Sequence, residues 1–261
     1  MPAEFRFDDG AAYDRYMGVW SRTVGSSFLE WLAPPKGWTW LDVGCGNGAF
    51  TRMIAERCAP AMIHGIDPSE GQLAFARTQL PPAIARFEKA DAMALPFGDD
   101  SMDAAVMPLV IFFVPDPAVG VAEMARVVRA GGIVAAYAWD MPGRGFPYAA
   151  VNDVLRATGI QSPKEANPDA SRLDRMQELW TGAGLHDVET REITVERTYP
   201  SFDEYWEIIL GGPSAGQFLR AFSPEERERF QKLLRERLGI GDTRGPFALS
   251  ARANAVRGRV K

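Results

Sequence analysis

A glycine-rich segment, residues 41–50 (LDVGCGNGAF), places a carboxylate two residues before the first of three alternating glycines. Glycine tolerates positive φ and has no Cβ, so such a loop lets a ligand approach the backbone itself. The helix that follows directs its N-terminus at an anionic group of that ligand. Asp42 would repel a pyrophosphate and attract an amine. The segment therefore predicts a cofactor loop that favours an amine-bearing ligand.

Two further carboxylates follow the next two predicted strands. Asp67 comes directly after the second strand, where a carboxylate of a doubly wound sheet can accept both hydroxyls of an adenosine ribose. Asp91 follows the third strand and could accept a hydrogen bond from an adenine amino group. The pattern Gly44-x-Gly46-x-x-Ala49 also fits nicotinamide and flavin sites, so an oxidoreductase stays open as an alternative. Those sites do not require Asp91.

The elements that must position these residues alternate between strands and helices. Short apolar runs separated by helical patterns are typical of βαβ units and a parallel sheet buried on both faces. Two later segments, 187–199 and 247–260, alternate well enough to be strands that pair at the sheet edge. We therefore expect an α/β fold with a doubly wound, mostly parallel seven-stranded sheet and an antiparallel edge strand. The other predicted strands are 38–43, 62–66, 85–90, 102–107 and 133–139, and the helices between them are 50–58, 69–80 and 117–129.

The rest of the chain is expected to surround this core within a single domain, 1–261. Residues 11–32 place apolar side chains at helical spacing and predict an N-terminal helical cap. The cofactor-binding core spans 38–140, and the C-terminal part spans 141–261. Within that part, a helical insert at 201–242 begins its two predicted helices with capping-box patterns, Ser201 with Glu204 and Ser223 with Glu226.

Composition excludes several classes of partner. The formal charge of −5, with acidic and basic residues scattered along the chain, disfavours a nucleic acid. Cys45 and Cys58 have no metal-ligand spacing, so we expect neither a metal site nor a disulfide framework, and a reducing cytoplasm fits best. No run approaches the roughly 18 apolar residues of a membrane span, and no signal region is apparent at Met1. We expect a cytoplasmic protein without a membrane span.

Residues 38–140, taken together, resemble the class I S-adenosylmethionine-dependent methyltransferases. The closest likeness is to the small-molecule branch that includes the quinone-biosynthesis enzymes. The segments that carry the resemblance are 41–50, 65–68, 89–92, 95–97, 102–106 and 123–132. The resemblance implies a Rossmann-like methyltransferase fold, S-adenosyl-L-methionine as cofactor and S-adenosyl-L-homocysteine as product.

The resemblance also implies roles for individual residues. Asp42 would hold the amino group of the methionine moiety, and the loop glycines would approach its carboxylate. Asp67 would bind the ribose and Asp91 the adenine. Residues 13–22 resemble a segment in which tyrosine and arginine close over the cofactor, which puts Arg22 near the carboxylate. The implied cofactor-binding residues are Tyr16, Arg22, Asp42, Gly44, Cys45, Gly46, Asp67, Pro68, Asp91, Ala92, Met107, Pro108 and Leu109.

The acceptor is expected to be a small molecule, with Tyr13, Tyr199 and Trp206 as candidate lining residues. No catalytic residue is identified, because the segment 108–113 is apolar and lacks the histidines of many relatives. A methyl on a sulfonium is already activated, so in-line transfer needs mainly alignment and desolvation. A non-catalytic S-adenosylmethionine-binding protein of the same fold is therefore a further alternative. The oligomeric state and the methylated atom are left open.

Overall fold

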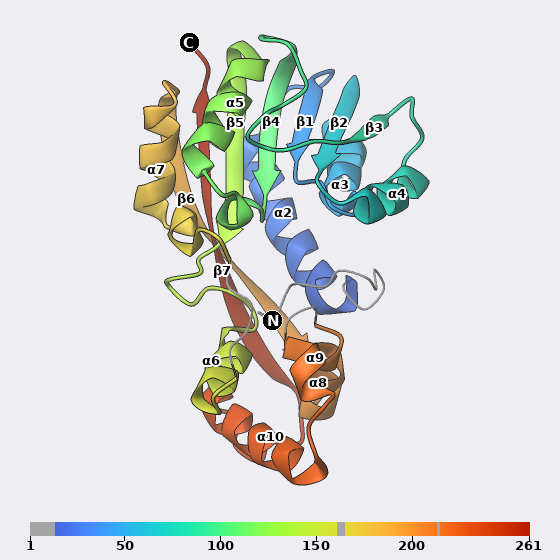
Figure 1. Ribbon diagram of the computed structural model, residues 1–261, viewed down its shortest axis with the longest axis vertical. Helices are drawn as coiled ribbons and strands as arrows, with labels where there is room; N and C mark the ends of the chain where they lie inside the picture. Colours follow the sequence, from blue (N-terminus) through green and yellow to red (C-terminus); the bar gives the residue numbers. More distant parts are fainter. Residues whose placement is uncertain (1–13, 161–164, 213–214) are drawn as a thin grey trace. The chain divides into compact units, whose positions relative to one another are not determined.

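The computed structural model contains one seven-stranded sheet with helices on both faces (Figure 1). It describes residues 14–160, 165–212 and 215–261. The strand order is β3-β2-β1-β4-β5-β7-β6. Neighbouring strands from β3 to β5 are parallel, and β7 is antiparallel to β5, which confirms the predicted fold class. The strands are β1 (Thr39–Val43), β2 (Met62–Asp67), β3 (Ala85–Lys89), β4 (Met102–Pro108), β5 (Val128–Trp139), β6 (His186–Tyr199) and β7 (Phe247–Arg259).

Helices cover both faces of the sheet, and three of them connect neighbouring parallel strands as βαβ units. Figure 1 shows α5 and α7 on one face of the sheet, and α2 and α3 on the other. The α-helices are α2 (Val19–Leu32), α3 (Ala49–Cys58), α4 (Glu70–Gln79), α5 (Pro117–Val127), α6 (Ala149–Ala157), α7 (Leu173–Gly182), α8 (Phe202–Leu210), α9 (Ala215–Leu219) and α10 (Pro224–Leu238). Shorter turns are the π-helical η1 (Asp14–Gly18) and the 3-10 turns η2 (Ile111–Phe113) and η3 (Pro168–Ser171).

The chain divides into two compact units, each assembled from three segments. We call residues 21–143, 165–194 and 252–261 the sheet unit, and residues 1–20, 144–164 and 195–251 the helical unit. The boundaries fall inside α2, β6 and β7, so these three elements contribute residues to both units.

The core of the sheet unit joins α2 and α3 to the sheet through aromatic rings. Phe28 of α2 lies 4.7 Å from the ring of Tyr137 on β5, and Phe50 of α3 lies 5.7 Å from the same ring. Phe28 and Tyr137 are buried almost completely, and so are the other apolar residues that mark the inner side of α2. The amphipathic pattern that predicted an N-terminal helix is thus confirmed over the described part of 11–32.

The boundary between α5 and β5 differs from the prediction. We expected a helix to Arg129 and a strand from Ile133, because Gly131 and Gly132 are typical of a helix end. The helix instead ends at Val127 and the strand begins at Val128. Pairing of β4 with β5 shifts register between Met102 and Ala104, so the glycines form an irregular stretch of strand.

The described residues of the insert at 201–242 form three helices where two were predicted. The short α9 was missed because its five residues carry no capping signal. Both predicted starts are confirmed in position. The Ser201 hydroxyl accepts a hydrogen bond from the Glu204 backbone N–H at 3.2 Å. Ser223 and Glu226 form a complete capping box at the start of α10.

Candidate functional site

The glycine loop after β1 is fixed to the end of β2 by backbone hydrogen bonds. The N–H groups of Gly44 and Cys45 both donate to the Ile66 carbonyl, at 2.8 and 2.9 Å. Gly44, Gly46 and Gly48 all have positive φ, at 73°, 52° and 80°. Their conformations are ones that L side chains rarely adopt, so the alternation of glycines follows from the path of this loop.

The first two glycines of the loop meet different surroundings. A Cβ on Gly44 would lie 2.5 Å from a methyl carbon of Val110, so Gly44 is required by close packing as well as by its φ. A Cβ on Gly46 would meet nothing within 4 Å. The space beside Gly46 is therefore open, and the predicted approach of a ligand to this backbone stays a prediction.

Asp67 ends β2 and holds the loop from the other side. Its Oδ2 accepts a hydrogen bond from the Gly46 N–H at 3.0 Å, and its Oδ1 accepts one from the Ser69 N–H at 2.8 Å. Burial raises the pKa of this carboxyl, while the two backbone donors act in the opposite direction. Each oxygen retains a second lone pair, so the group can still accept hydroxyl donors.

Asp42 is the most unusual group at this edge because it is an acidic side chain with 0% exposure. Its Oδ2 accepts a 2.6 Å hydrogen bond from the Thr51 hydroxyl, and its buried Oδ1 has no partner among the described residues. Burial raises the pKa of Asp42 to about 7; the Thr51 hydrogen bond lowers it and the nearby Asp67 raises it further. A cation beside Oδ1 would stabilise the ionised form.

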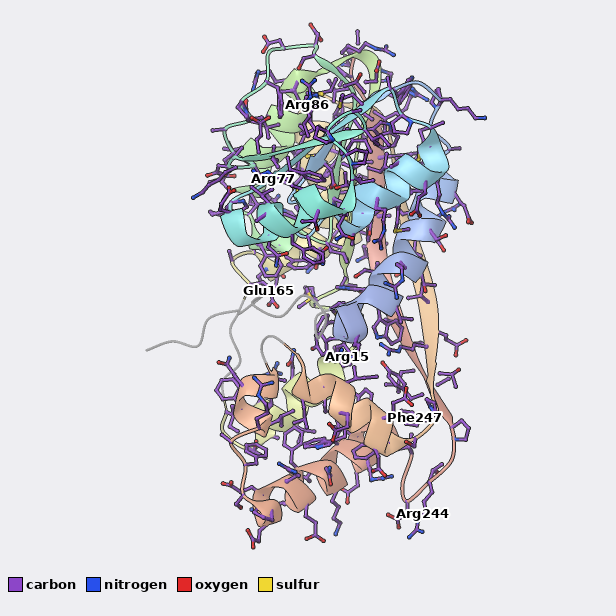
Figure 2. All side chains as sticks on the ribbon, turned by 90° about the vertical axis from the view of Figure 1, so that its right-hand side faces the viewer. Arg15, Arg77, Arg86, Glu165, Arg244 and Phe247 are labelled. Atoms are coloured by element: carbon purple, nitrogen blue, oxygen red, sulfur yellow. The ribbon has the colours of Figure 1, made fainter. Side chains whose placement is uncertain are left out.

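The adenine position predicted from Asp91 and Ala92 lies just after β3. Asp91 is exposed, and its Oδ1 accepts a hydrogen bond from the Met93 N–H at 2.8 Å. Strand β3 is held by α4, since the Arg77 guanidinium, which lies beside β3 in Figure 2, donates to the Phe87 carbonyl at 3.0 Å. Pro68, next to the ribose position, is exposed. These positions and Asp67 therefore occupy adjacent strand ends.

The end of β4 supplies an apolar wall next to the loop. Met107 and Pro108 are buried at the end of the strand. Leu109 has a φ of 60°, which is strained for a branched apolar residue, and its N–H donates to the Tyr137 carbonyl at 2.7 Å. Val110 then packs on Gly44. The segment predicted to pass beside the sulfonium thus adjoins the glycine loop.

Cys45 is a small, buried side chain between two glycines of the loop. Its side chain is 6% exposed, and burial raises the pKa of its thiol far above the ordinary value. A thiol that stays protonated is a poor nucleophile.

The remaining predicted residues lie elsewhere in the fold. Tyr16, in the helical unit, is buried and stacks on Tyr148 with ring centroids 4.0 Å apart. Tyr199 accepts a hydrogen bond from the Trp20 indole at 3.2 Å and stacks on Phe247, which Figure 2 labels at the start of β7. These are core contacts of the helical unit.

Trp206, also in the helical unit, is 4% exposed and packs against Phe230. Arg22 is exposed on α2 in the sheet unit. Tyr13 lies outside the described residues. The ligand contacts predicted for these residues, and for Tyr16 and Tyr199, stay predictions.

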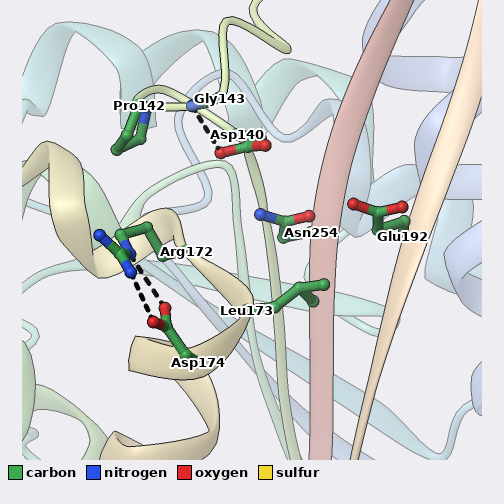
Figure 3. A pocket seen from close by; sticks show the side chains of 8 residues that line it. All are labelled: Asp140, Pro142, Gly143, Arg172, Leu173, Asp174, Glu192 and Asn254. Carbon is green, nitrogen blue, oxygen red and sulfur yellow. Dashed lines mark hydrogen bonds and ion pairs between the residues drawn. The ribbon is translucent and has the colours of Figure 1, made fainter.

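A separate surface pocket of about 440 Å³ lies in the sheet unit (Figure 3). Arg172 and Asp174, both in the lining, pair with each other, since Arg172 donates to Asp174 at 2.9 Å. Asp140 accepts at 2.5 Å from Arg252, which lies outside the lining. None of the predicted cofactor residues lines this pocket. The lining residues are Asp140, Pro142, Gly143, Arg172, Leu173, Asp174, Glu192 and Asn254.

Residues 14–160, 165–212 and 215–261 lack two kinds of feature. No helix there is long and apolar enough to cross a bilayer. No three histidine, cysteine, aspartate or glutamate side chains gather there in a way that could hold a metal ion.

Comparisons with known proteins show the family of this chain. Residues 41–136 match the family described as a methyltransferase domain. The chain is 35% identical over 136 residues to an uncharacterised methyltransferase of Mycobacterium leprae, a match that covers 51% of this chain and 50% of that relative. It is 31% identical over 230 residues to the 2-methyl-6-phytyl-1,4-hydroquinone methyltransferase of Synechocystis, covering 85% of this chain and 71% of the relative. The chain belongs to the class I S-adenosylmethionine-dependent methyltransferase family.

A solved structure shows the same fold at low sequence identity. The phosphoethanolamine N-methyltransferase 2 of Haemonchus contortus, solved with phosphomonomethylethanolamine and S-adenosylhomocysteine, superposes with a TM-score of 0.63. It is 18% identical, and the match covers 98% of this chain and 58% of that protein. The chain also spans only about half the length of the mycobacterial relatives it matches.

Sequence reasoning missed one residue of this site, Thr51. Its hydroxyl is the hydrogen-bond partner of Asp42, and it is 0% exposed. The available signal was its position: Thr51 lies on the apolar side of a predicted helix. It follows by one turn the glycine loop that begins beside Asp42. The hydrogen bond between Asp42 and Thr51 could not be predicted from local patterns, because it joins a strand to the first turn of α3.

Proposed function

We propose that this protein is an S-adenosylmethionine-dependent methyltransferase that acts on a small, partly apolar acceptor. Family membership supports methyl transfer. The Synechocystis relative carries the name of a hydroquinone methyltransferase, which supports a small-molecule acceptor of some apolar character. The Haemonchus neighbour, solved with S-adenosylhomocysteine, supports the cofactor. The insert 201–242 remains our candidate for selecting the acceptor, since the sheet does not need it.

The observation that carries the proposal is Oδ1 of Asp42, a buried oxygen for which the described part of the chain supplies no partner. A buried acceptor without a partner is destabilising, and the ionised form more so. A ligand ammonium group would satisfy Oδ1 and neutralise the carboxylate. The adjacent N-terminus of α3 carries partial positive charge, which suits a ligand carboxylate. The aminoacyl end of S-adenosylmethionine has both groups.

The other strand ends fit the nucleoside part. Asp67 retains lone pairs for the two ribose hydroxyls, and Asp91 with Ala92 would face the adenine. When bound, S-adenosylmethionine would supply a methyl group activated by its sulfonium. Met107, Pro108 and Leu109 would exclude water beside it and align the acceptor, which is the main demand of in-line transfer. A cytoplasmic location, as expected from the cysteines, is part of the proposal.

Isothermal titration with S-adenosylmethionine and S-adenosylhomocysteine tests the cofactor assignment. We expect saturable binding of both, and folded protein that binds neither well above micromolar concentration would overturn it. A second experiment supplies methyl-labelled S-adenosylmethionine together with a small-molecule extract. Label that appears in the low-molecular-weight fraction supports an enzyme with a small acceptor. Cofactor binding without transfer to any fraction would favour the non-catalytic alternative.

A further inference from the structure

The hydrogen bond from Thr51 gives the two carboxylate oxygens of Asp42 different surroundings. Both residues have 0% exposure, so water does not compete for this hydrogen bond. The Thr51 hydroxyl approaches Oδ2 at 2.6 Å, a distance typical of a hydroxyl that donates to an ionised acceptor. Oδ1 has no partner among the described residues. One oxygen is therefore held by the protein, and the other is left for a ligand.

Two strands and one helix confine this carboxyl group. Asp42 lies on the interior strand β1, paired with Gly65 of β2 and Val106 of β4. Neither neighbour has a side chain that can donate a hydrogen bond. Thr51, on the third residue of α3, provides the one side-chain hydroxyl donor that the structure shows for Asp42.

We propose that Thr51 is a positioning residue for the cofactor: it holds Oδ2 and so orients the Asp42 carboxylate, which leaves Oδ1 to receive the ammonium group of the methionine moiety. The inference rests on the proposed function and extends it to a residue that does not itself touch the ligand. Threonine is suited to this role because its branched side chain is restricted at χ1, so the hydroxyl is held in place.

The protonation of Asp42 links this geometry to a measurable pH dependence. The ionisable groups that face Asp42 are Asp67 and the thiol of Cys45, and neither stabilises its negative charge. Burial and Asp67 favour the protonated carboxyl, and the Thr51 hydrogen bond opposes them. Without that hydrogen bond, the pKa of Asp42 would rise further, and an ammonium ligand would have to displace its proton up to a higher pH.

The experiment compares Thr51→Val with Thr51→Ser by titration of S-adenosylhomocysteine between pH 6 and 8.5. Valine keeps the shape and removes the donor, whereas serine keeps the donor. We expect Thr51→Val to bind about tenfold more weakly at pH 7, since a hydrogen bond to a charged group is worth about that factor. The deficit should shrink as the pH rises towards 8.5. Thr51→Ser should follow the wild type.

5′-Methylthioadenosine is the matched control ligand, because it has the nucleoside and the sulfur but no aminoacyl group. Thr51→Val should bind it as the wild type does. Equal loss for both ligands, or a loss that is constant with pH, would show a merely structural role and overturn the inference. If Thr51→Val does not fold, Thr51→Ala removes the same donor. Failure of the wild type to bind S-adenosylhomocysteine would instead contradict the proposed function.

Discussion

The backbone N–H of Gly46 donates a 3.0 Å hydrogen bond to Oδ2 of Asp67, so the side chain that ends β2 holds the loop that follows β1. The same carboxylate accepts from the Ser69 N–H, at the start of α4. One side chain thus connects two loops at adjacent strand ends. This connection explains why an aspartate at this position serves the protein even before a ribose is bound.

Replacement of Asp67 with alanine should therefore weaken S-adenosylhomocysteine binding by about 1.5–3 kcal/mol, the value of a hydrogen bond to a charged group. Asp67→Asn should lose less, because the amide oxygen can still accept one backbone donor. Asp169→Ala, at an exposed aspartate of η3, is the control and should bind as the wild type does. Isothermal titration measures all three, and an unchanged affinity in Asp67→Ala would remove this residue from the site.

Gly44→Ala should destabilise the protein by a combination of strain and overlap. Alanine at φ 73° costs about 1–2 kcal/mol, and the Cβ overlap with Val110 adds about 1–3 kcal/mol. The double variant Gly44→Ala with Val110→Ala relieves the overlap and should recover part of the loss. Urea denaturation measures the free energy of unfolding of each. A double variant no more stable than Gly44→Ala would contradict the packing argument.

The buried carboxyl of Asp42 should make the stability of the ligand-free protein depend on pH. Its pKa is about 7 in the folded state, against an ordinary value of 3.8. Between these values the folded chain keeps a proton that the unfolded chain has lost, so this group's stabilising contribution is lost as the pH rises.

Asp42→Asn lacks this titration. Relative to the wild type, its free energy of unfolding should rise by up to about 1.4 kcal/mol per pH unit between pH 4 and 7, and then level off. Urea denaturation of both proteins at several pH values gives the difference. A difference that does not change with pH would refute the prediction.

Removal of the Tyr199 hydroxyl should destabilise the helical unit. The Trp20 indole N–H donates to this hydroxyl at 3.2 Å, and both residues are fully buried. Tyr199→Phe leaves that donor unsatisfied and should cost about 1–3 kcal/mol. Trp20→Phe combined with Tyr199→Phe should cost less than the sum of the single changes, because it removes both partners. Additive losses in a double-mutant cycle would show that the hydrogen bond contributes nothing.

Much of the sheet could be predicted because its strands carry continuous apolar runs and its helices carry clear starts. The strand ends that bear Asp42, Asp67 and Asp91 were placed within a residue of their observed positions, since a polar residue after a buried run marks an end. The two strands at the edge were found from their alternation. Local patterns were sufficient to place an element wherever its first and last residues coincide with the limits of a buried apolar run.

The features that could not be predicted depend on contacts between elements that are distant in the sequence. Gly131 and Gly132 belong to β5 because the pairing with β4 tolerates an irregular stretch there, against their usual preference for helix ends. The partner of Asp42 is another case, since Thr51 lies on a different element. The burial of Tyr199 among other aromatic rings likewise follows from tertiary packing and not from its spacing.

The division of the chain into two units made of three segments each has a consequence for how such proteins diversify. The polypeptide passes between the units five times, after residues 20, 143, 164, 194 and 251, and three of these crossings lie within a helix or a strand. Exchange of a whole unit by recombination between relatives would need several simultaneous breakpoints inside regular structure. New specificities should therefore arise in this lineage by point substitution and by changes in loop length, while the two units are inherited together.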